Sequence, residues 1–277
     1  MTTLQREQWD VKEKADWWSA GQARRQETLG RATEMMLDMA GVQSGSRVLD
    51  VAAGTGESSL MAARRVGPTG YVLGVDFSAS MLNVAAEAAR KDGISNVEMR
   101  VMNAEALELD ADSFDAVISR IALMLFPNPA KALTEMRRVV KSNGRVAAIV
   151  FSALENNPYH GIVYDTVRRI GNIPLPAAGE PWIYALGNQT ALESVYSRAG
   201  FLNVSIQTVP IVRRFSSASD AIRRSRSGAG DVRQVINRLS ESSREVAWAE
   251  VEQQFKQFEG PNGLEIPGEV LIGVGTK

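Results

Sequence analysis

The stretch from Arg47 to Gly56, RVLDVAAGTG, constrains this chain more than any other. Apolar residues with one acid, Asp50, form the pattern of a buried strand, and the Gly-x-Gly that follows lets the backbone turn sharply and approach a ligand closely. A second apolar run, residues 71–75, ends at Asp76, twenty residues past Gly56. A carboxylate at that place in a βαβ unit is positioned to bind both hydroxyls of a ribose. The pattern predicts a nucleoside site at the carboxyl ends of two adjacent parallel strands.

Residues 46–151 alternate predicted strands and helices with short connections. The strands are expected at 46–51, 70–75, 97–101, 115–119 and 144–151. Helices are expected at 57–66, 79–92 and 129–141, with a weaker one at 104–113. Such alternation is typical of a parallel sheet with right-handed crossovers and with helices on both faces.

The flanking parts of the chain follow other patterns. Residues 1–43 form two helical pieces, the longer at about 22–40. After residue 151 the expected elements are helices at 153–172 and 189–199, a strand at 204–209, helices within 217–258 and a last strand at 270–274. The late helices interrupt the sequence of strands, so we expect them to form a cap over the site.

Four segments fall at the ends of consecutive predicted strands, namely residues 50–56, 76–77, 103–105 and 119–120. Ligands of open parallel sheets bind outside the carboxyl ends of the strands. The convergence of four separate segments on one edge therefore predicts the binding site there.

Composition excludes several classes of site. With 277 residues the chain forms one large domain, or one domain with an appendage. Its 31 Lys and Arg against 32 Asp and Glu, net −1, give no electrostatic footprint for nucleic acid or for an anionic membrane.

The absence of cysteine and the single histidine, His160, exclude disulfides, cysteine nucleophiles and thiolate or multi-histidine metal sites, so no metal is expected. No membrane-length apolar run and no signal-peptide core is present, so we expect a cytoplasmic protein without a membrane span.

Five segments together resemble the motifs of class I S-adenosylmethionine-dependent methyltransferases: residues 48–56, 74–82, 102–107, 114–120 and 140–145. Residues 192–201 are similar to the ubiquinone/menaquinone-biosynthesis methyltransferase type. The resemblance is strong over 30–151 and looser over 186–277. It implies an α/β, Rossmann-like fold with a mainly parallel seven-stranded sheet, helices on both faces and a helical cap.

The resemblance also implies the activity, in which S-adenosyl-L-methionine loses its methyl group to a small molecule by in-line displacement. The glycine bend would lie beside the methionine moiety, Asp76 would bind the ribose, and Asn103 would meet the adenine edge. Asp50 either meets the ligand or holds the amides of the loop, and Glu105 either borders the cofactor or begins a helix. The candidate cofactor-binding residues are Asp50, Ala52, Ala53, Gly54, Thr55, Gly56, Asp76, Phe77, Met81, Asn103, Ala104, Glu105, Ser119 and Arg120.

The chain departs from the family pattern at a few positions. Ala53 stands where many relatives have cysteine, and Asn103 where aspartate is common; an amide still offers a donor and an acceptor to adenine. Residues 142–144, Ser-Asn-Gly, replace a Pro-Gly-Gly type of turn. None of these changes removes a group that cofactor binding needs.

The resemblance suggests three parts: an N-terminal helical lid (1–43), a cofactor-binding core (44–151), and a C-terminal part (152–277). Within the last part, residues 152–185 and 217–259 are the expected cap insertions. The acceptor atom stays open among carbon, oxygen and nitrogen, because the cap carries no motif; the resemblance favours a small, largely apolar and aromatic molecule. The sequence does not indicate an oligomeric state.

Candidate substrate-side residues come from the aromatic residues and from the one histidine. His160 and Tyr184 are candidate general bases, although a structural histidine is the common alternative. Trp17, Trp18, Tyr159 and Trp182 either line the substrate site or pack the lid and the cap. The basic pairs 213–214 and 223–224 are solvated faces or, alternatively, anchors for an acidic substrate.

Two competing functions come from other classes. A nicotinamide oxidoreductase is disfavoured because Ser59 occupies the third glycine position of its fingerprint. A cofactor-binding protein that has lost transfer is the second alternative. Residues 156–159, Asn-Asn-Pro-Tyr, resemble the site of amino-methylating nucleic-acid enzymes, but that motif belongs after the fourth strand, so we expect no nucleic-acid substrate.

Overall fold

A computed structural model describes residues 10–177, 179–227 and 231–277. Its centre is an eight-stranded sheet with the order β3-β2-β1-β4-β5-β8-β6, in which the short β7 pairs with β8. The strands are β1 (Arg47–Val51), β2 (Tyr71–Asp76), β3 (Val97–Val101), β4 (Phe114–Arg120), β5 (Val140–Phe151), β6 (Leu202–Phe215), β7 (Glu259–Gly260) and β8 (Gly263–Thr276). Apart from β7, this is the expected seven-stranded sheet.

The first five strands are parallel; β8 runs antiparallel to β5, and β6, antiparallel to β8, runs in the same direction as the first five. β1 lies between β2 and β4, so its carboxyl end is at the point where the strand order reverses. The side chains of β1 from residue 48 to 51 are all buried, as expected for a strand covered on both faces. This central strand leads directly into the glycine bend.

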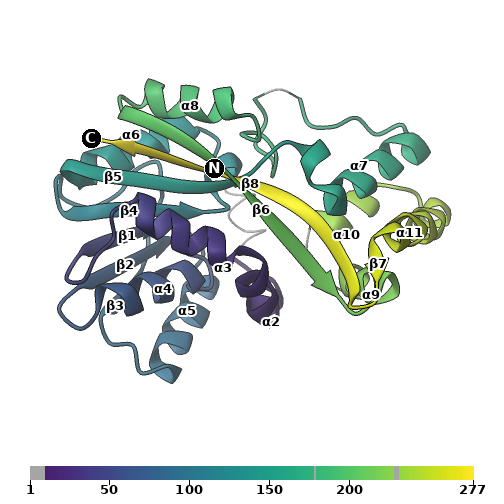
Figure 1. Cartoon of the computed structure of the whole chain (residues 1–277), viewed down its shortest axis with the longest axis horizontal. Helices are drawn as coiled ribbons and strands as arrows, with labels where there is room; N and C mark the ends of the chain where they lie inside the picture. Colours follow the sequence, from purple (N-terminus) through teal and green to yellow (C-terminus); the bar gives the residue numbers. More distant parts are fainter. Residues whose placement is uncertain (1–9, 178, 228–230) are drawn as a thin grey trace.

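Helices cover both faces of the sheet (Figure 1). α3, α4 and α5 pack on one face, and α6 and α8 pack together on the other. The helices are α2 (Lys12–Ala20), α3 (Gln22–Met39), α4 (Glu57–Val66), α5 (Ala79–Lys91), α6 (Pro129–Val139), α7 (Pro158–Gly171), α8 (Gln189–Arg198), α9 (Ala218–Ser227), α10 (Asp231–Ile236) and α11 (Glu241–Phe255), with 3-10 turns η1 (Leu123–Leu125), η2 (Leu154–Asn156) and η3 (Lys256–Phe258). The Rossmann-like class expected from the sequence is confirmed.

The long strands β6 and β8 form a ribbon that leaves the sheet and reaches a separate group of helices. Their ladder is unbroken from Ser205, opposite Val274, to Phe215, opposite Leu264. α7, α9, α10 and α11 gather at the far end of this ribbon, at the right of Figure 1. The sequence predicted these helices but only the inner part of each of these two strands.

The weak helix predicted at 104–113 is wrong. The chain makes a turn and an isolated bridge between Asn103 and Ala106 instead. Side chains of α6 bind the backbone groups that a helix would use: Glu135 accepts the Leu107 N–H, and Arg138 donates to the carbonyls of Leu107 and of residue 109. Tertiary hydrogen bonds thus override the local propensity.

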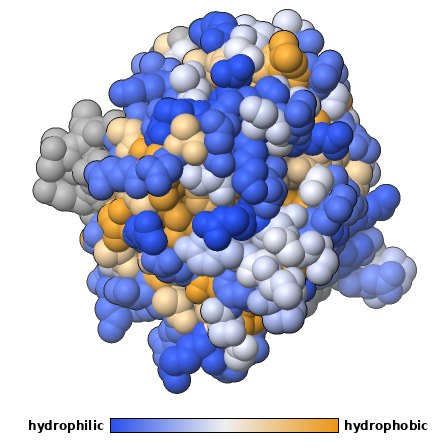
Figure 2. All heavy atoms as spheres, turned by 90° about the vertical axis from the view of Figure 1, so that its left-hand side faces the viewer, coloured by the Kyte–Doolittle hydropathy of each residue, from blue (hydrophilic) through white to orange (hydrophobic). Residues whose placement is uncertain are grey.

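Hydrophilic residues dominate the face of the molecule that Figure 2 shows, with apolar patches between them. The exposed large apolar side chains of the described segments are far apart in the chain: Val11, Val101, Leu202 and Val246. No helix in that part of the chain has the length and apolar character needed to cross a bilayer.

Candidate functional site

The bend after β1 uses its two glycines for different reasons. Gly54 and Gly56 have φ of +55° and +84°, and Ala52 before them has φ of +60°. A Cβ at Gly56 would lie 2.7 Å from the Cβ of Ala85 on α5, so close packing requires glycine there. A Cβ at Gly54 would meet nothing within 4 Å. The open space in front of Gly54 leaves its backbone accessible to a ligand.

Asp50 is fully buried below this bend. The hydroxyls of Ser58 and Ser59 donate to its Oδ2 at 2.7 and 2.6 Å, while its Oδ1 has no hydrogen-bond partner. Burial raises the pKa of the Asp50 carboxyl to about 6, against the opposing effect of the two serines and of Arg120. Ser59, which breaks the nicotinamide fingerprint, therefore serves to hold this acid, and Oδ1 is a buried acceptor that lacks a donor.

Asp76 joins the end of β2 to the bend. Its carboxylate accepts the N–H of Gly54 at 2.9 Å and the N–H of Ser78 at 2.9 Å. Burial raises the pKa of Asp76, while the backbone N–H groups of Ser78, Gly54 and Phe77 oppose the rise. A carboxylate offers about four acceptor positions, so capacity remains for a ligand hydroxyl. Met81 packs, buried, in the first turn of α5.

Asp10, which no sequence pattern indicated, also lies at this edge. Its Oδ1 accepts hydrogen bonds from the Ser78 hydroxyl at 3.0 Å and from the Ser80 N–H at 2.9 Å. The segment before α2 thus lies over the start of α5, beside Asp76. Such a contact joins residues about seventy positions apart, so no local sequence pattern indicates it.

The third segment of the edge is held by its own polar side chains. Asn103 Oδ1 accepts the N–H of Glu105 at 3.1 Å, and Glu105 Oε1 accepts the N–H of Asn128 at 3.0 Å. Asn103 and Ala104 are half-buried. Both acceptors thus shape the turn, and the Asn103 amide group keeps its donor nitrogen for other partners.

A buried charge cluster, defined here as Arg25, Glu57 and Arg120, joins three elements beside the bend. Glu57 begins α4, Arg120 ends β4 and Arg25 lies on α3; both arginines form ion pairs with the Glu57 carboxylate. Only 6% of the Glu57 side chain and 7% of the Arg120 side chain are exposed. Arg120 also donates to Thr33 of α3 at 3.4 Å. The sequence predicted Arg120 alone, because the pairing depends on contacts across the fold.

The end of β4 carries two further marks of a functional site. The Ser119 hydroxyl is buried and has no hydrogen-bond partner. Ile121 has φ of +56°, which is costly for a β-branched residue. Such strain gathers at binding sites, where the surrounding structure holds it.

A second group of side chains, the aromatic cluster, lies beyond the carboxyl end of β5. His160 Nδ1 and the Tyr184 hydroxyl share a 2.6 Å hydrogen bond, and both side chains are buried. Burial, with a smaller effect from Arg213, holds the pKa of His160 well below its usual range. The rings contact one another at 5.0–5.9 Å between centroids, and the cluster comprises Phe151, Tyr159, His160, Tyr164, Trp182 and Tyr184.

The predicted substrate-side residues lie in two places, the aromatic cluster and helix α2. Tyr159 and Trp182 belong to the aromatic cluster, with the two candidate bases. Trp17 and Trp18 lie on α2, where the Arg25 guanidinium stacks over the Trp18 ring at 4.5 Å. The tryptophans of α2 are thus associated with the charge cluster.

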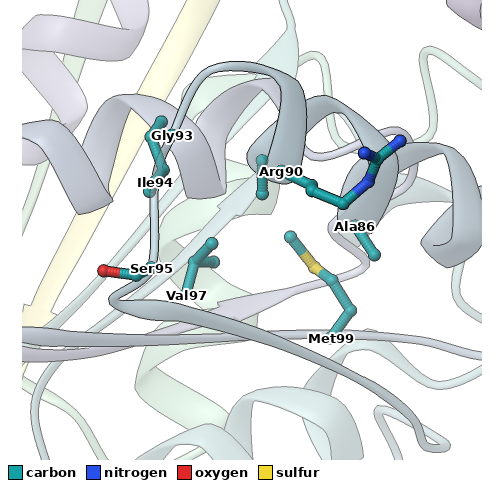
Figure 3. A pocket seen from close by; sticks show the side chains of 8 residues that line it. Ala86, Arg90, Gly93, Ile94, Ser95, Val97 and Met99 are labelled. Atoms are coloured by element: carbon teal, nitrogen blue, oxygen red, sulfur yellow. The ribbon is translucent and has the colours of Figure 1, made fainter.

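Two surface hollows lie away from these groups. The first, of about 370 Å³, lies between α5 and the edge strand β3, and Figure 3 shows Arg90, Val97 and Met99 on its wall. The second, of about 480 Å³, lies between the start of α6, α8 and residues 179–181 and 185–186. Neither is lined by a predicted site residue.

The edge of the sheet has the donor and acceptor groups that a nucleoside with an amino-acid tail requires. The space at Gly54 admits a ligand against the backbone, Asp76 has capacity for hydroxyls, and Asp50 Oδ1 awaits a donor. The described part of the chain contains no cluster of three His, Asp or Glu side chains that could hold a metal ion.

Comparisons with known proteins identify the family and the fold. Residues 42–194 match the family described as "Methyltransferase domain". The Ubiquinone/menaquinone biosynthesis C-methyltransferase UbiE of Cronobacter sakazakii is 34% identical over 179 residues, covering 61% of this chain and 71% of the relative. The Demethylmenaquinone methyltransferase of Listeria welshimeri is 42% identical over 108 residues, covering 39% of this chain and 46% of that protein.

Solved structures share the fold. The YcgJ protein of Bacillus subtilis superposes with a TM-score of 0.59 at 22% identity, covering 90% of this chain and 98% of that chain. A Haemonchus contortus phosphoethanolamine N-methyltransferase 2 in complex with S-adenosylhomocysteine superposes with a TM-score of 0.60 at 18% identity, covering 98% of this chain and 60% of that chain. At these identities the likeness concerns the fold.

The charge cluster generates a stability prediction. Glu57→Gln should lower the free energy of unfolding by about 3–5 kcal/mol, because it leaves two buried guanidinium groups without a carboxylate. Arg64→Met, which breaks an exposed ion pair with Asp92, should change it by less than about 1 kcal/mol. Urea unfolding of both variants measures the difference. Equal effects would show that the cluster contributes no more than a surface ion pair.

Asp50 generates a prediction about pH. Its folded pKa of about 6 lies above the usual 3.8, so its contribution to stability is fully present below pH 4 and is lost as pH rises through 6. Relative to Asp50→Asn, the wild-type protein should lose about 2–2.5 kcal/mol of unfolding free energy between pH 4 and pH 7. Denaturant unfolding across this range measures the difference. A difference that does not vary with pH would contradict the perturbed carboxyl.

Proposed function

This chain belongs to the methyltransferase family that its residues 42–194 match, and from that premise we propose how its residues carry out S-adenosylmethionine-dependent transfer of a methyl group to a small molecule. The enzyme is a methyltransferase, and its cofactor supplies a methyl group on a sulfonium, which a nucleophile displaces in line. The protein then contributes mainly alignment and exclusion of water.

We propose that the edge formed by β1, β2 and β4 binds the cofactor. Asp76 would accept the ribose hydroxyls, Gly54 would lie against the methionine moiety, and Asp50 Oδ1 would accept from its ammonium group. The observation that carries this assignment is the open space at Gly54, whose N–H donates to the buried carboxylate of Asp76. The residues proposed to complete the site are Ala52, Ala53, Thr55, Gly56, Phe77, Met81, Asn103, Ala104, Glu105, Ser119 and Arg120.

The acceptor proposed for the enzyme is a small, largely apolar aromatic molecule. Two relatives have quinone-related names, and Tyr159 and Trp182, both in the aromatic cluster, are proposed to border the acceptor site. Trp17 and Trp18 would close the other side of the acceptor from α2. The net charge of −1 favours such a molecule over a nucleic acid.

His160 and Tyr184 are proposed to take up the proton that a carbon or hydroxyl acceptor releases. The lowered pKa keeps the His160 imidazole neutral at pH 7, which is the state a proton acceptor needs. The same lowering makes it a weak base, so it suits acceptors whose proton is already acidic, such as phenols. The hydrogen bond between Nδ1 and the Tyr184 hydroxyl fixes the orientation of the ring.

Transfer of a labelled methyl group tests the function. With labelled S-adenosylmethionine and a panel of hydroquinones, catechols and phenols, we expect label in at least one product. Calorimetry should detect S-adenosylhomocysteine binding and no NAD binding.

Asp76→Ala should weaken the binding of S-adenosylhomocysteine at least about tenfold through the loss of charge-assisted hydrogen bonds, whereas the exposed control Asp92→Ala should not. Unchanged affinity in the Asp76 variant would remove the ribose assignment.

A pair of glycine substitutions tests the proposed cradle. Gly54 and Gly41 both have positive φ, +55° and +74°, and both have open space where a Cβ would stand. Either change to alanine should cost about 1–2 kcal/mol of stability through the left-handed backbone. Only Gly54→Ala should also weaken S-adenosylhomocysteine binding, by about tenfold or more, because its methyl group would occupy the ligand's place. Equal affinities in the two variants would contradict the cradle.

A further inference from the structure

Four arginines lie where the ribbon meets the cap, and one of them differs from the rest. Three have carboxylate partners: Arg214 pairs with Glu27 and Glu265, and Arg223 and Arg224 pair with Asp220. Arg213, on β6, forms no ion pair with any residue of the described segments, although it is half-buried. Arg213 is thus the one arginine of these four without a carboxylate partner among the described residues.

The Arg213 guanidinium lies against the aromatic cluster. Its central carbon is 5.4 Å from the centroid of the Phe151 ring and 5.0 Å from that of Tyr159. Phe151 is the last residue of β5, so this cation stands at the carboxyl edge of the sheet. Tyr159 in turn contacts His160 at 5.0 Å between ring centroids. The two candidate bases and this cation thus belong to one connected group.

Arg213 and the aromatic cluster together carry a net positive charge. Burial together with Arg213 itself lowers the pKa of His160 and so keeps this imidazole neutral. Ring stacking stabilises a guanidinium but leaves its charge uncompensated. Arginine binds oxyanions through a planar array of donors, and the donors of Arg213 make no hydrogen bond to a described residue. An anionic oxygen is therefore the partner that the group lacks.

We propose that Arg213 binds an anionic oxygen, a carboxylate or a phenolate, carried by an aromatic methyl acceptor. This inference rests on the proposed function, because it assigns the acceptor class to the same enzyme. The anion would neutralise the cation and lie close to His160. The acceptor ring would then stand beside the edge where the cofactor is proposed to bind.

The test compares an anion with its uncharged analogue. Binding of 2-naphthoate and of 2-naphthamide is measured by calorimetry at saturating S-adenosylhomocysteine. We expect the wild-type protein and the Arg214→Gln control to prefer 2-naphthoate by about tenfold or more. Arg213→Gln should lose this preference, and Arg213→Lys should regain part of it. A wild-type protein without the preference, or an Arg213→Gln variant that keeps it, would overturn the proposal.

The single histidine provides a second readout. Its C2 proton gives one NMR signal, which should shift on addition of 2-naphthoate in the wild-type protein and in Arg214→Gln, but not in Arg213→Gln. A shift that persists in Arg213→Gln would place the anion elsewhere. S-adenosylhomocysteine affinity, measured for each variant, separates the two hypotheses: a wild-type protein that binds it without preferring the anion refutes only the inference, and one that does not bind it refutes the function.

Discussion

The hydrogen bond from the Gly54 N–H to the Asp76 carboxylate is the contact on which the site depends. It joins the end of β2 to the bend after β1, and the same carboxylate also accepts the N–H of Ser78 at the start of α5. One buried acid therefore fixes the relative positions of a bend and a helix. Because burial disfavours its charge, Asp76 needs these donors to remain ionised, and the bend needs the acid to keep its shape. A site for a polar ligand follows from this mutual requirement.

The sequence predicted the parts of this arrangement that depend on local patterns. The central strands, the helix at 57–66 and the four segments at the carboxyl edge follow from apolar runs and from glycine positions. Ser59 departs from the nicotinamide-binding motif in the sequence. In the structure its hydroxyl donates a hydrogen bond to the Asp50 carboxylate, a role that the motif does not indicate. The pairing of Arg25 with Glu57 and the contact of Asp10 with Ser80 depend on long-range packing, which no local pattern encodes.

The two sides of the site are built on different physical principles. The proposed cofactor side uses buried charges and backbone N–H groups, so its geometry is fixed by hydrogen bonds whose loss is costly. The proposed acceptor side uses rings, one neutral imidazole and Arg213, which would constrain a ligand by shape and by a single charge. The first arrangement suits a ligand that stays the same across a family, and the second can accept other molecules after few substitutions.

The ribbon of β6 and β8 has a mechanical consequence. The antiparallel ladder is unbroken from residue 205 to 215. Its continuous backbone hydrogen bonds therefore join the helices at the far end of the ribbon to the sheet. The N-terminal arm, in contrast, is fastened near the bend by the side chain of Glu57. Movement of α3 away from the bend would therefore break a buried ion pair, which is costly.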